Sequence, residues 1–600
     1  MILLVLCVAF SVFAGGKQEA PKEETKEPVE VKEEMAKPAV KNPDTYIWAS
    51  YGTIDSLDPS KTYDSASWTN LAVLYDTLVT YEGESTSKFK PMLATEVPTI
   101  ENGLVTNGGK TWKFPIRKGV KFHSGDTLTP EDVEYTFERN MVTDIDAGPN
   151  WIWYYLFFDG VWGSRDGDGN IVVDFADIDK AVEVEGDYVV FNLANPFPAF
   201  LGTIAGYWAS ITNKSFVIEN GGWDGTAAGY PAANNPPEDM ETLNSIEDGT
   251  GPFKMVRWEK GVEMVHERFD DYWGTKPSIK KVINRIVDEW STRKLMLLQG
   301  DADCVTVDAL YYPEMDKEEG LKVYKDQPSL NVTGLFFNQD IAAQDNPLIG
   351  SGKLDGEGVP PDFFSSLDVR LGFTYAWQQD VFIEEISNNT SMDPVTPIPT
   401  GLPYKNPNQK RLPYDLKKAE EHFKKAFGGR VWENGFKLEF LYNEGNDVRR
   451  AVCMMLAENV MKLNPKFQIS VRAAEWSEYV DMIRKSNMPF FNVGWAPDYP
   501  DPDNYANPFM HSQGHYAHQC GYSNPEVDKL VEEAAISFDP DLRKKNYYRV
   551  QEIFIEDAVG IVYSQPLSRV YMRDWMNGYY FNPMYSHEDF ENVKWMTKGY

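Results

Sequence analysis

Three aspartates and a tryptophan lie within eleven residues of this sequence, in the segment GWAPDYPDPDN at residues 494–504. The segment also contains three prolines, and a proline-rich stretch of this kind predicts a loop. Carboxylates in a loop can coordinate a metal ion, form a catalytic pair, or bind a charged or ring-shaped ligand. The rest of the sequence is needed to choose among these three kinds of site.

The loop gives little support to catalysis or to calcium binding. A glycosidase needs two carboxylates on either side of the bond it cleaves, whereas Asp498, Asp501 and Asp503 share one loop. The loop also lacks the central glycine and distal glutamate of an EF-hand, and the acidic run at residues 166–177 has Ile171 in place of that glycine and predicts a hairpin turn. We assign no catalytic residue, expect no enzyme, and expect Asp501 and Asp503 to shape the loop.

A group of histidines follows the loop and offers a rival site. The segment HSQGHYAHQC contains His511, His515, His518 and Cys520, with only seven histidines in the whole chain. This spacing is compatible with a transition metal, although chance histidines in a surface loop are the simpler explanation. We assign no metal ligand and no cofactor, and keep these four residues as an alternative.

The charge and the composition exclude other classes. The net charge of −33 repels nucleic acid, so no nucleic-acid partner is expected. A length of 600 residues, with 42% hydrophobic residues, predicts a globular protein of more than one domain. Besides Cys7, the cysteines are Cys304, Cys453 and Cys520, and three scattered thiols predict buried free cysteines more readily than a disulfide.

The N-terminal segment predicts export. Residues 1–14, MILLVLCVAFSVFA, form an apolar run typical of a signal peptide, although no basic residue precedes it, which leaves open whether Met1 is the true start. Cys7 lacks the small residues that precede a lipidated cysteine, so a lipid anchor is not expected. Residues 15–44 are dense in Glu, Lys and Pro and predict a disordered linker. We therefore expect a periplasmic or cell-surface protein.

The rest of the chain predicts a mixed α/β fold. TYIWAS, from Thr45, predicts the first strand, and strands and helices then alternate without a short repeat. Thr129 followed by Pro130 predicts the start of a helix with Val133, Phe137 and Met141 on its apolar face. Asp415 predicts the N-cap of a second helix, with Leu416, Ala419, Phe423 and Phe427 on one face and glycines 428 and 429 as its stop.

Several segments together resemble the family 5 extracellular solute-binding proteins of ABC importers, which include receptors for peptides, nickel and some oligosaccharides. The matching segments follow the order of the family between residues 56 and 535. They are SLDPSKTYDSASWTNLAVLYDTLVTYEGE, WKFPIRKGVKFHSGDTLTPEDVEYTFER, GTGPFKMVRWEKGVEMVHERFDDYWGTKPSIKKV, STRKLMLLQGDADC, DVRLGFTYAWQQDVFI, GWAPDYPDPDN and YSNPEVDKLVEEA.

This resemblance implies a two-lobed periplasmic-binding-protein-like α/β fold with three domains, hinged near Ile286 and Val562. Domain I would comprise residues 45–85, 208–287 and 563–600, domain II residues 86–207, and domain III residues 288–562. The resemblance also implies a monomeric receptor that delivers its ligand to the permease subunits of an ABC importer in the inner membrane.

The resemblance assigns site residues as well. In peptide-binding members, the aspartate at the position of Asp498 accepts the ammonium group of the peptide. The other implied ligand-binding residues are Gly494, Trp495, Ala496 and Tyr499 in the same loop, Trp476, and Tyr63, Asp64 and Ser65 in a facing loop.

The ligand expected from this resemblance is a short oligopeptide, bound in a cleft between the two lobes. An oligosaccharide is the alternative, and nickel or another metal a less favoured one. FFNVGW lacks the arginine that some peptide receptors carry before the motif. Sugars stack on tryptophan rings and bond to carboxylates. Such platforms could come from Trp48, Trp68, Trp151, Trp153 and Trp223, although each of them is more typical of a core.

Overall fold

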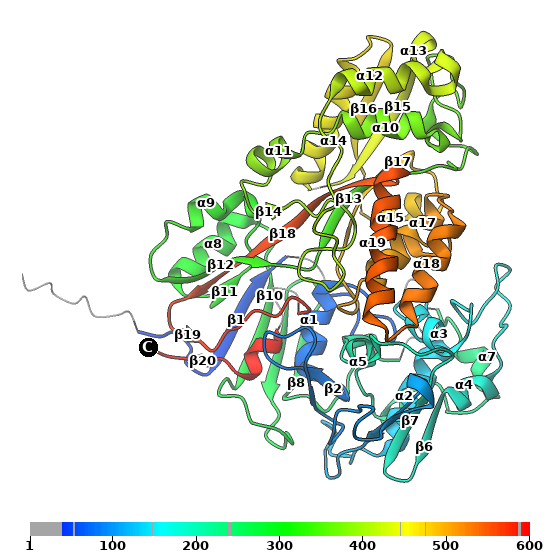
Figure 1. The fold of residues 1–600 in the computed structure, drawn as a ribbon. Coiled ribbons are helices and arrows are strands. Elements are labelled where there is room, and N and C mark those ends of the chain that lie inside the picture. Colours follow the sequence, from blue (N-terminus) through cyan, green and yellow to red (C-terminus); the bar gives the residue numbers. More distant parts are fainter. Residues whose placement is uncertain are drawn as a thin grey trace, which may run out of the picture. The chain divides into compact units, whose positions relative to one another are not determined.

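A ten-stranded mixed sheet organises the chain after residue 39 (Figure 1). The computed structural model describes residues 39–600, except residues 52–53, 147, 238–239, 241, 445, 475 and 586–589. The main path of the sheet runs through β17 (Phe490–Trp495), β13 (Val332–Phe337), β18 (Gly560–Arg573), β11 (Cys304–Val305), β1 (Thr45–Ser50), β10 (Lys281–Ile286), β9 (Glu263–Arg268) and β8 (Phe253–Glu259). β12 (Leu321–Pro328) and β14 (Ser391–Met392) also pair with β18.

The strand β18 joins the two halves of this sheet. Its first residues pair with β13, its middle residues with β14, and its last residues with β12 and β11. Figure 1 shows it in red, running from the side of β11 to the side of β17. The register is fixed on the β13 side by Gly334 opposite Val562 and on the β11 side by Cys304 opposite Met572. One continuous strand therefore pairs with strands from both halves of the sheet.

A second, four-stranded sheet lies among residues 105–192. It has the order β4 (Val105–Thr106), β5 (Thr111–Pro115), β7 (Tyr188–Asn192), β6 (Val182–Glu185). The helices of this region and its surroundings are α1 (Ser65–Leu74), α2 (Pro130–Thr143), α3 (Trp151–Phe157), α4 (Phe175–Ala181), α5 (Phe200–Ile204), α6 (Lys214–Glu219) and α7 (Tyr230–Ala233). A hairpin of β2 (Val79–Tyr81) and β3 (Phe89–Pro91) lies beside them.

The remaining helices lie between residues 290 and 556. They are α8 (Trp290–Gln299), α9 (Tyr312–Met315), α10 (Leu367–Tyr375), α11 (Gln379–Val381), α12 (Leu416–Lys425), α13 (Arg430–Asn434), α14 (Asp447–Met461), α15 (Trp476–Arg484), α16 (Asp503–Met510), α17 (His515–Gln519), α18 (Pro525–Ala535) and α19 (Pro540–Glu556). β15 (Phe436–Asn443) pairs in parallel with β16 (Phe467–Ala474), and β19 (Met576–Asn577) pairs with β20 (Thr597–Lys598).

Both helices expected from local signals are confirmed. α2 begins at Pro130 with Thr129 as N-cap and a capping box to Asp132, and Val133, Phe137 and Met141 are buried. α12 begins after Asp415, whose carboxylate accepts hydrogen bonds from the backbone N–H groups of residues 417 and 418. Its predicted core residues Ala419 and Phe423 are buried. The signals that predicted these helices therefore fix where they begin. The expected end of the second helix was wrong, because α12 stops at Lys425, before the glycines, and Phe427 lies beyond it with a positive φ of 52°.

Smaller expectations agree with the structure too. Cys304, Cys453 and Cys520 are buried free thiols, and Asp166 starts a tight turn closed by its bond to Asn170. Within the described residues, no helix is long and apolar enough to cross a membrane. The expected signal peptide, and the linker up to residue 38, lie outside the described residues.

The predicted domain boundaries stay a prediction, and the strand pairing bears on one of them. Residues 288–328, which were expected to begin domain III, contribute β11 and β12. β11 pairs with β1, and its Val305 shares a hydrophobic cluster with Ile47 and Leu297. This pairing favours a boundary near residue 329, between β12 and β13, over one at residue 288.

Candidate ligand-binding site

The loop after β17 is held in shape by Asn504, the second residue of α16. The Asn504 Oδ1 atom accepts hydrogen bonds from the Asp498 backbone N–H at 2.8 Å and from Trp495 Nε1 at 3.1 Å. Its Nδ2 atom donates to Asp498 Oδ2 at 2.9 Å. One amide side chain therefore fixes the positions of both Trp495 and Asp498.

Asp498 meets Tyr63, as the resemblance implied. The Tyr63 hydroxyl donates to Asp498 Oδ1 at 2.8 Å, and Trp151 Nε1 donates to the Tyr63 hydroxyl oxygen at 3.3 Å. These three residues come from the segment before α1, from the start of α3 and from the loop after β17. The structure thus brings together side chains from all three predicted domains.

The environment of Asp498 suits a cationic partner. Its carboxylate is 2% exposed, and in the described part of the chain it receives side-chain hydrogen bonds only from the neutral groups of Asn504 and Tyr63. Burial raises the pKa of Asp498 to about 6, and those two hydrogen bonds oppose the rise. A desolvated carboxylate of this kind gains strongly from a charge-assisted hydrogen bond with a cation.

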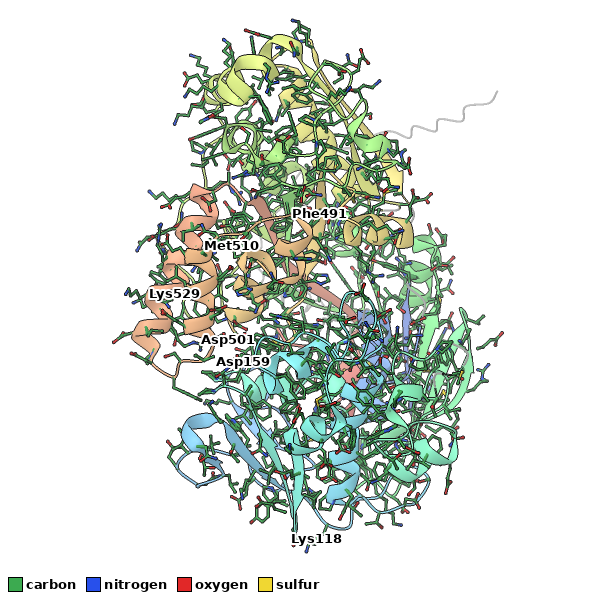
Figure 2. The ribbon with its side chains drawn as sticks, turned by 90° about the vertical axis from the view of Figure 1, so that its right-hand side faces the viewer. Lys118, Asp159, Phe491, Asp501, Met510 and Lys529 are labelled. Carbon is green, nitrogen blue, oxygen red and sulfur yellow. The ribbon has the colours of Figure 1, made fainter. Side chains whose placement is uncertain are left out.

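Asp501 and Asp503 have partners that stabilise the loop, as expected. Asp501 Oδ1 accepts a hydrogen bond from Arg543 Nη2 at 2.6 Å and one from the backbone N–H of Asp503 at 2.9 Å. Asp503 Oδ2 accepts from the Tyr499 hydroxyl at 2.8 Å and from the Tyr155 hydroxyl at 3.4 Å. Burial and the charge of Asp501 raise the pKa of Asp503 to about 7. Figure 2 labels Asp501 on this loop and Asp159, which follows α3.

The other expected site residues divide into four groups. Gly494 pairs with Thr333 in the β13–β17 ladder and Ala496 follows the strand, so both lie beside Asp498. Tyr499 is 2% exposed and its ring packs against Phe197, so it helps to hold the loop in place.

Asp64 is occupied as the N-cap of α1, where its Oδ1 atom accepts a hydrogen bond from the Ser67 backbone N–H at 2.9 Å. The backbone of Ser65 starts α1 and that of Trp476 starts α15, and the side chains of both lie outside the described part.

The structure adds a residue that sequence reasoning missed. Arg449 Nη2, from α14, lies 3.8 Å from where a Cβ atom on Gly494 would lie. Burial raises the pKa of Tyr516 to about 12, the positive charge of Arg449 opposes this rise, and the charge of Asp498 adds to it. Tyr516 is therefore within electrostatic range of both Arg449 and Asp498. In the sequence this position is distinguished only as one of two adjacent arginines, at residues 449 and 450.

The histidine cluster does not gather into a metal site. His511 Nε2 bonds to Glu532 Oε1 at 3.2 Å, Cys520 is buried, and His515 lies beside the ring of Trp495. No three His, Cys, Asp or Glu side chains among the described residues are placed to hold a metal ion. Of the possible sugar platforms, Trp48, Trp153 and Trp223 are buried in the core, whereas Trp68 and Trp151 are half-buried.

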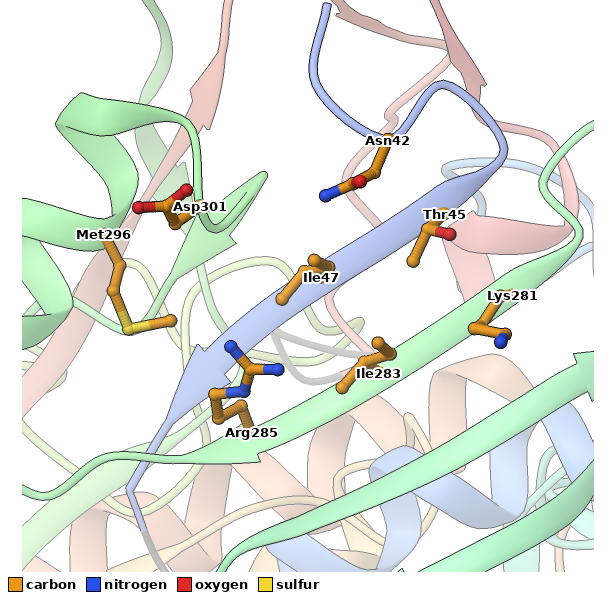
Figure 3. A pocket seen from close by; sticks show the side chains of 8 residues that line it. All are labelled: Asn42, Thr45, Ile47, Lys281, Ile283, Arg285, Met296 and Asp301. Atoms are coloured by element: carbon orange, nitrogen blue, oxygen red, sulfur yellow. The ribbon is translucent and has the colours of Figure 1, made fainter.

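A separate cavity lies over β1 and β10. Its lining residues are far from the Asp498 loop in the sequence. It has a volume of about 500 Å³, and its lining includes Ile47, Ile283, Arg285, Met296 and Asp301 (Figure 3). None of the expected ligand-binding residues contributes to it, and we assign it no ligand.

Comparison of the sequence with known proteins finds a matching family and several relatives. The sequence model of the family described as bacterial extracellular solute-binding proteins, family 5 Middle, matches residues 88–517. The chain is 26% identical over 549 residues to the probable D,D-dipeptide-binding periplasmic protein DdpA of Escherichia coli, covering 90% of this chain and 92% of that protein.

Two solved structures share the fold. The Helicobacter pylori periplasmic binding protein DppA, in complex with the peptide STSA, has a TM-score of 0.72 at 23% identity, covering 93% of this chain and 98% of that one. Bacillus subtilis AppA, in complex with a nonapeptide, has a TM-score of 0.72 at 20% identity, covering 93% and 99%.

Proposed function

This chain belongs to the family 5 bacterial extracellular solute-binding proteins, and from that premise we propose that it captures a short peptide at the Asp498 loop and delivers it to an ABC permease. Proteins of this family are transport receptors and not enzymes, and the expected fold class, a two-lobed periplasmic-binding-protein-like α/β fold, is confirmed. Export to the periplasm or cell surface and action as a monomer are further parts of the proposal.

The observation that carries the proposal is the buried carboxylate of Asp498. A peptide brings a terminal ammonium group, which can donate to a carboxylate that otherwise receives only neutral donors. Tyr63 and Trp495 place aromatic rings near the same carboxylate, and aromatic faces also favour a cation. A sugar hydroxyl would bring no charge to offset the burial of Asp498.

Two further features suit an extended peptide. β17 is the last strand on the main path of the sheet, and beyond β13 it pairs with no other described strand. Its outer edge at Gly494, Trp495 and the following Ala496 can therefore add the main chain of a ligand as a further strand. Arg449, beside Gly494, can bond the terminal carboxylate of a short peptide.

Entry of the ligand requires the loop to part from Tyr63. Asp498 is 2% exposed and bonds to Tyr63 of another predicted domain, which supports the proposal that this arrangement is the closed one. Opening about β18 and the link between β12 and β13 would expose the carboxylate, and ligand binding would shift the population back toward closure.

A thermal-shift screen tests the proposal. Free dipeptides and tripeptides are expected to raise Tm, because a ligand present at 100 times its Kd adds about 2.7 kcal/mol of stability. An N-acetylated dipeptide is expected to give no shift, and a C-amidated one a smaller shift, because each lacks one terminal charge. A shift with maltotriose, cellotriose or Ni²⁺, and none with peptides, would contradict the peptide assignment.

The affinity for peptides is expected to depend on pH in a bell shape. The pKa of Asp498 is raised to about 6, and only the ionised carboxylate can pair with an ammonium group, so binding strengthens about tenfold as pH rises from about 5 to about 7. Above about pH 8 the peptide amine loses its proton and binding weakens again. Isothermal titration calorimetry across this range checks the shape. A constant Kd between pH 5 and 7 would argue against Asp498 as the ammonium acceptor.

A further inference from the structure

Three aromatic side chains form a stack beside the Asp498 loop. Trp151 and Tyr155 are four residues apart on α3, so they share one face of the helix. The ring of Trp162 stacks on both, with centroids 6.2 Å from Trp151 and 5.0 Å from Tyr155 and interplanar angles of 23° and 28°. All three rings are half-buried, whereas Trp153 on the same helix is fully buried in the core. We call these three residues the aromatic stack.

The aromatic stack is joined to the loop at two points. One hydroxyl group, that of Tyr63, separates Trp151 Nε1 from the carboxylate of Asp498. The Tyr155 hydroxyl donates to Asp503 Oδ2 at 3.4 Å. A ligand whose ammonium group pairs with Asp498 therefore has its first side chain within reach of these rings.

Two buried carboxylates lie beside the aromatic stack. Asp498 and Asp503 are buried, and neither forms an ion pair with a cationic side chain of the described chain. The Oδ1 atom of Asp503 has no hydrogen-bond partner there. Arg543, which bonds to this loop, is paired with Asp501. Among the described residues, no lysine or arginine lies over the ring of Trp151, Tyr155 or Trp162.

We propose that the aromatic stack is a subsite for the first side chain of the ligand and that it selects a cationic side chain, arginine above lysine. This assignment rests on the proposed function. Ring faces attract cations, and the planar guanidinium group also stacks on tryptophan, which the ammonium group of lysine cannot do. The nearby carboxylates strengthen the preference for a cation and disfavour an acidic side chain.

Calorimetry with matched dipeptides tests the subsite. Arg-Ala is expected to bind about tenfold more tightly than Ala-Ala, Lys-Ala to lie between them, and Glu-Ala to bind more weakly than Ala-Ala. Trp162→Leu is the variant of choice because, among the described residues, the side-chain hydrogen-bond partners of Tyr63 and Asp503 do not include Trp162. It is expected to reduce the advantage of Arg-Ala over Ala-Ala to less than about twofold, because Arg-Ala loses the ring face on which its guanidinium group stacks.

Two further variants and one further dipeptide distinguish the possible outcomes. Trp162→Phe, which keeps a ring, should retain an advantage of about threefold for Arg-Ala. Trp432 is a half-buried tryptophan on α13, and Trp432→Leu serves as the control. It should change the affinity for neither dipeptide. Equal binding of Phe-Ala and Arg-Ala, or equal weakening of Arg-Ala and Ala-Ala by Trp162→Leu, would overturn the subsite and leave the proposed function standing. Failure of the wild type to bind any dipeptide would overturn both.

Discussion

Replacing Asp498 with asparagine is expected to weaken the binding of short peptides by about 100- to 1,000-fold. Loss of one partner of a buried, hydrogen-bonded charge pair costs about 2–5 kcal/mol, because the other charge is left buried and unpaired. Asparagine has nearly the same shape and can still accept the hydrogen bond from Tyr63. Calorimetry with Ala-Ala at pH 7 measures the loss, and circular dichroism checks that the fold is kept.

Asp64→Asn is the matched control for this variant. It removes a negative charge from the residue next to Tyr63, and asparagine caps helices about as well as aspartate, so α1 should keep its N-cap. Its Kd for Ala-Ala should stay within about threefold of the wild type, because the Asp64 side chain caps α1 and asparagine can replace it there. Full affinity in Asp498→Asn, or an equal loss in both variants, would contradict a direct bond between Asp498 and the ammonium group.

Replacing Arg543 with methionine is expected to lower the free energy of unfolding by about 3–5 kcal/mol, because it leaves the buried charge of Asp501 without its partner. The two side chains are 8% and 9% exposed and lie 2.6 Å apart. Urea unfolding followed by tryptophan fluorescence measures the change. Arg549→Met, on the same helix, is the control. Its guanidinium pairs with Glu526 and Glu556 at 35% exposure, and its loss should cost less than about 1 kcal/mol.

The double variant Asp501→Asn with Arg543→Met separates this charge effect from packing. It removes both charges together, so it should be more stable than Arg543→Met alone. If the double variant is as unstable as the single one, packing of the arginine side chain on Tyr404 and Tyr547 accounts for the loss.

The parts of the fold that follow from local chemistry were predictable. Thr129 with Pro130, and Asp415 before an apolar stripe, fix helix starts through atoms within a few residues, so α2 and α12 could be placed from the sequence. Asp64 is likewise a good N-cap residue, and it lies directly before α1. The resemblance instead assigned it to the ligand, and the structure shows that its carboxylate is used locally.

The contacts that make the site could not be read from local pattern. Tyr63 and Asp498 were paired only through the family resemblance, because nothing near either residue points to the other. Arg449 lies on α14 and Gly494 on β17, 45 residues further along the chain, so no local pattern indicated that the two come close. The pairing of β11 with β1 joins residues 288–328 to the strands of the first predicted domain, and no local pattern in the sequence indicated that pairing.

The position of β18 in the sequence also sets the order in which this protein can fold. Thr45 pairs with Lys281 and Trp48 with Cys304, yet β11, β12 and β13 find their common partner only at residues 560–573. α2 and α12 can form early, whereas the sheet must wait for nearly the whole chain. A chain that ends before β18 would keep its helices but leave open strand edges, onto which other chains can add. Such truncations should therefore aggregate during synthesis, long before any defect in ligand capture could be measured.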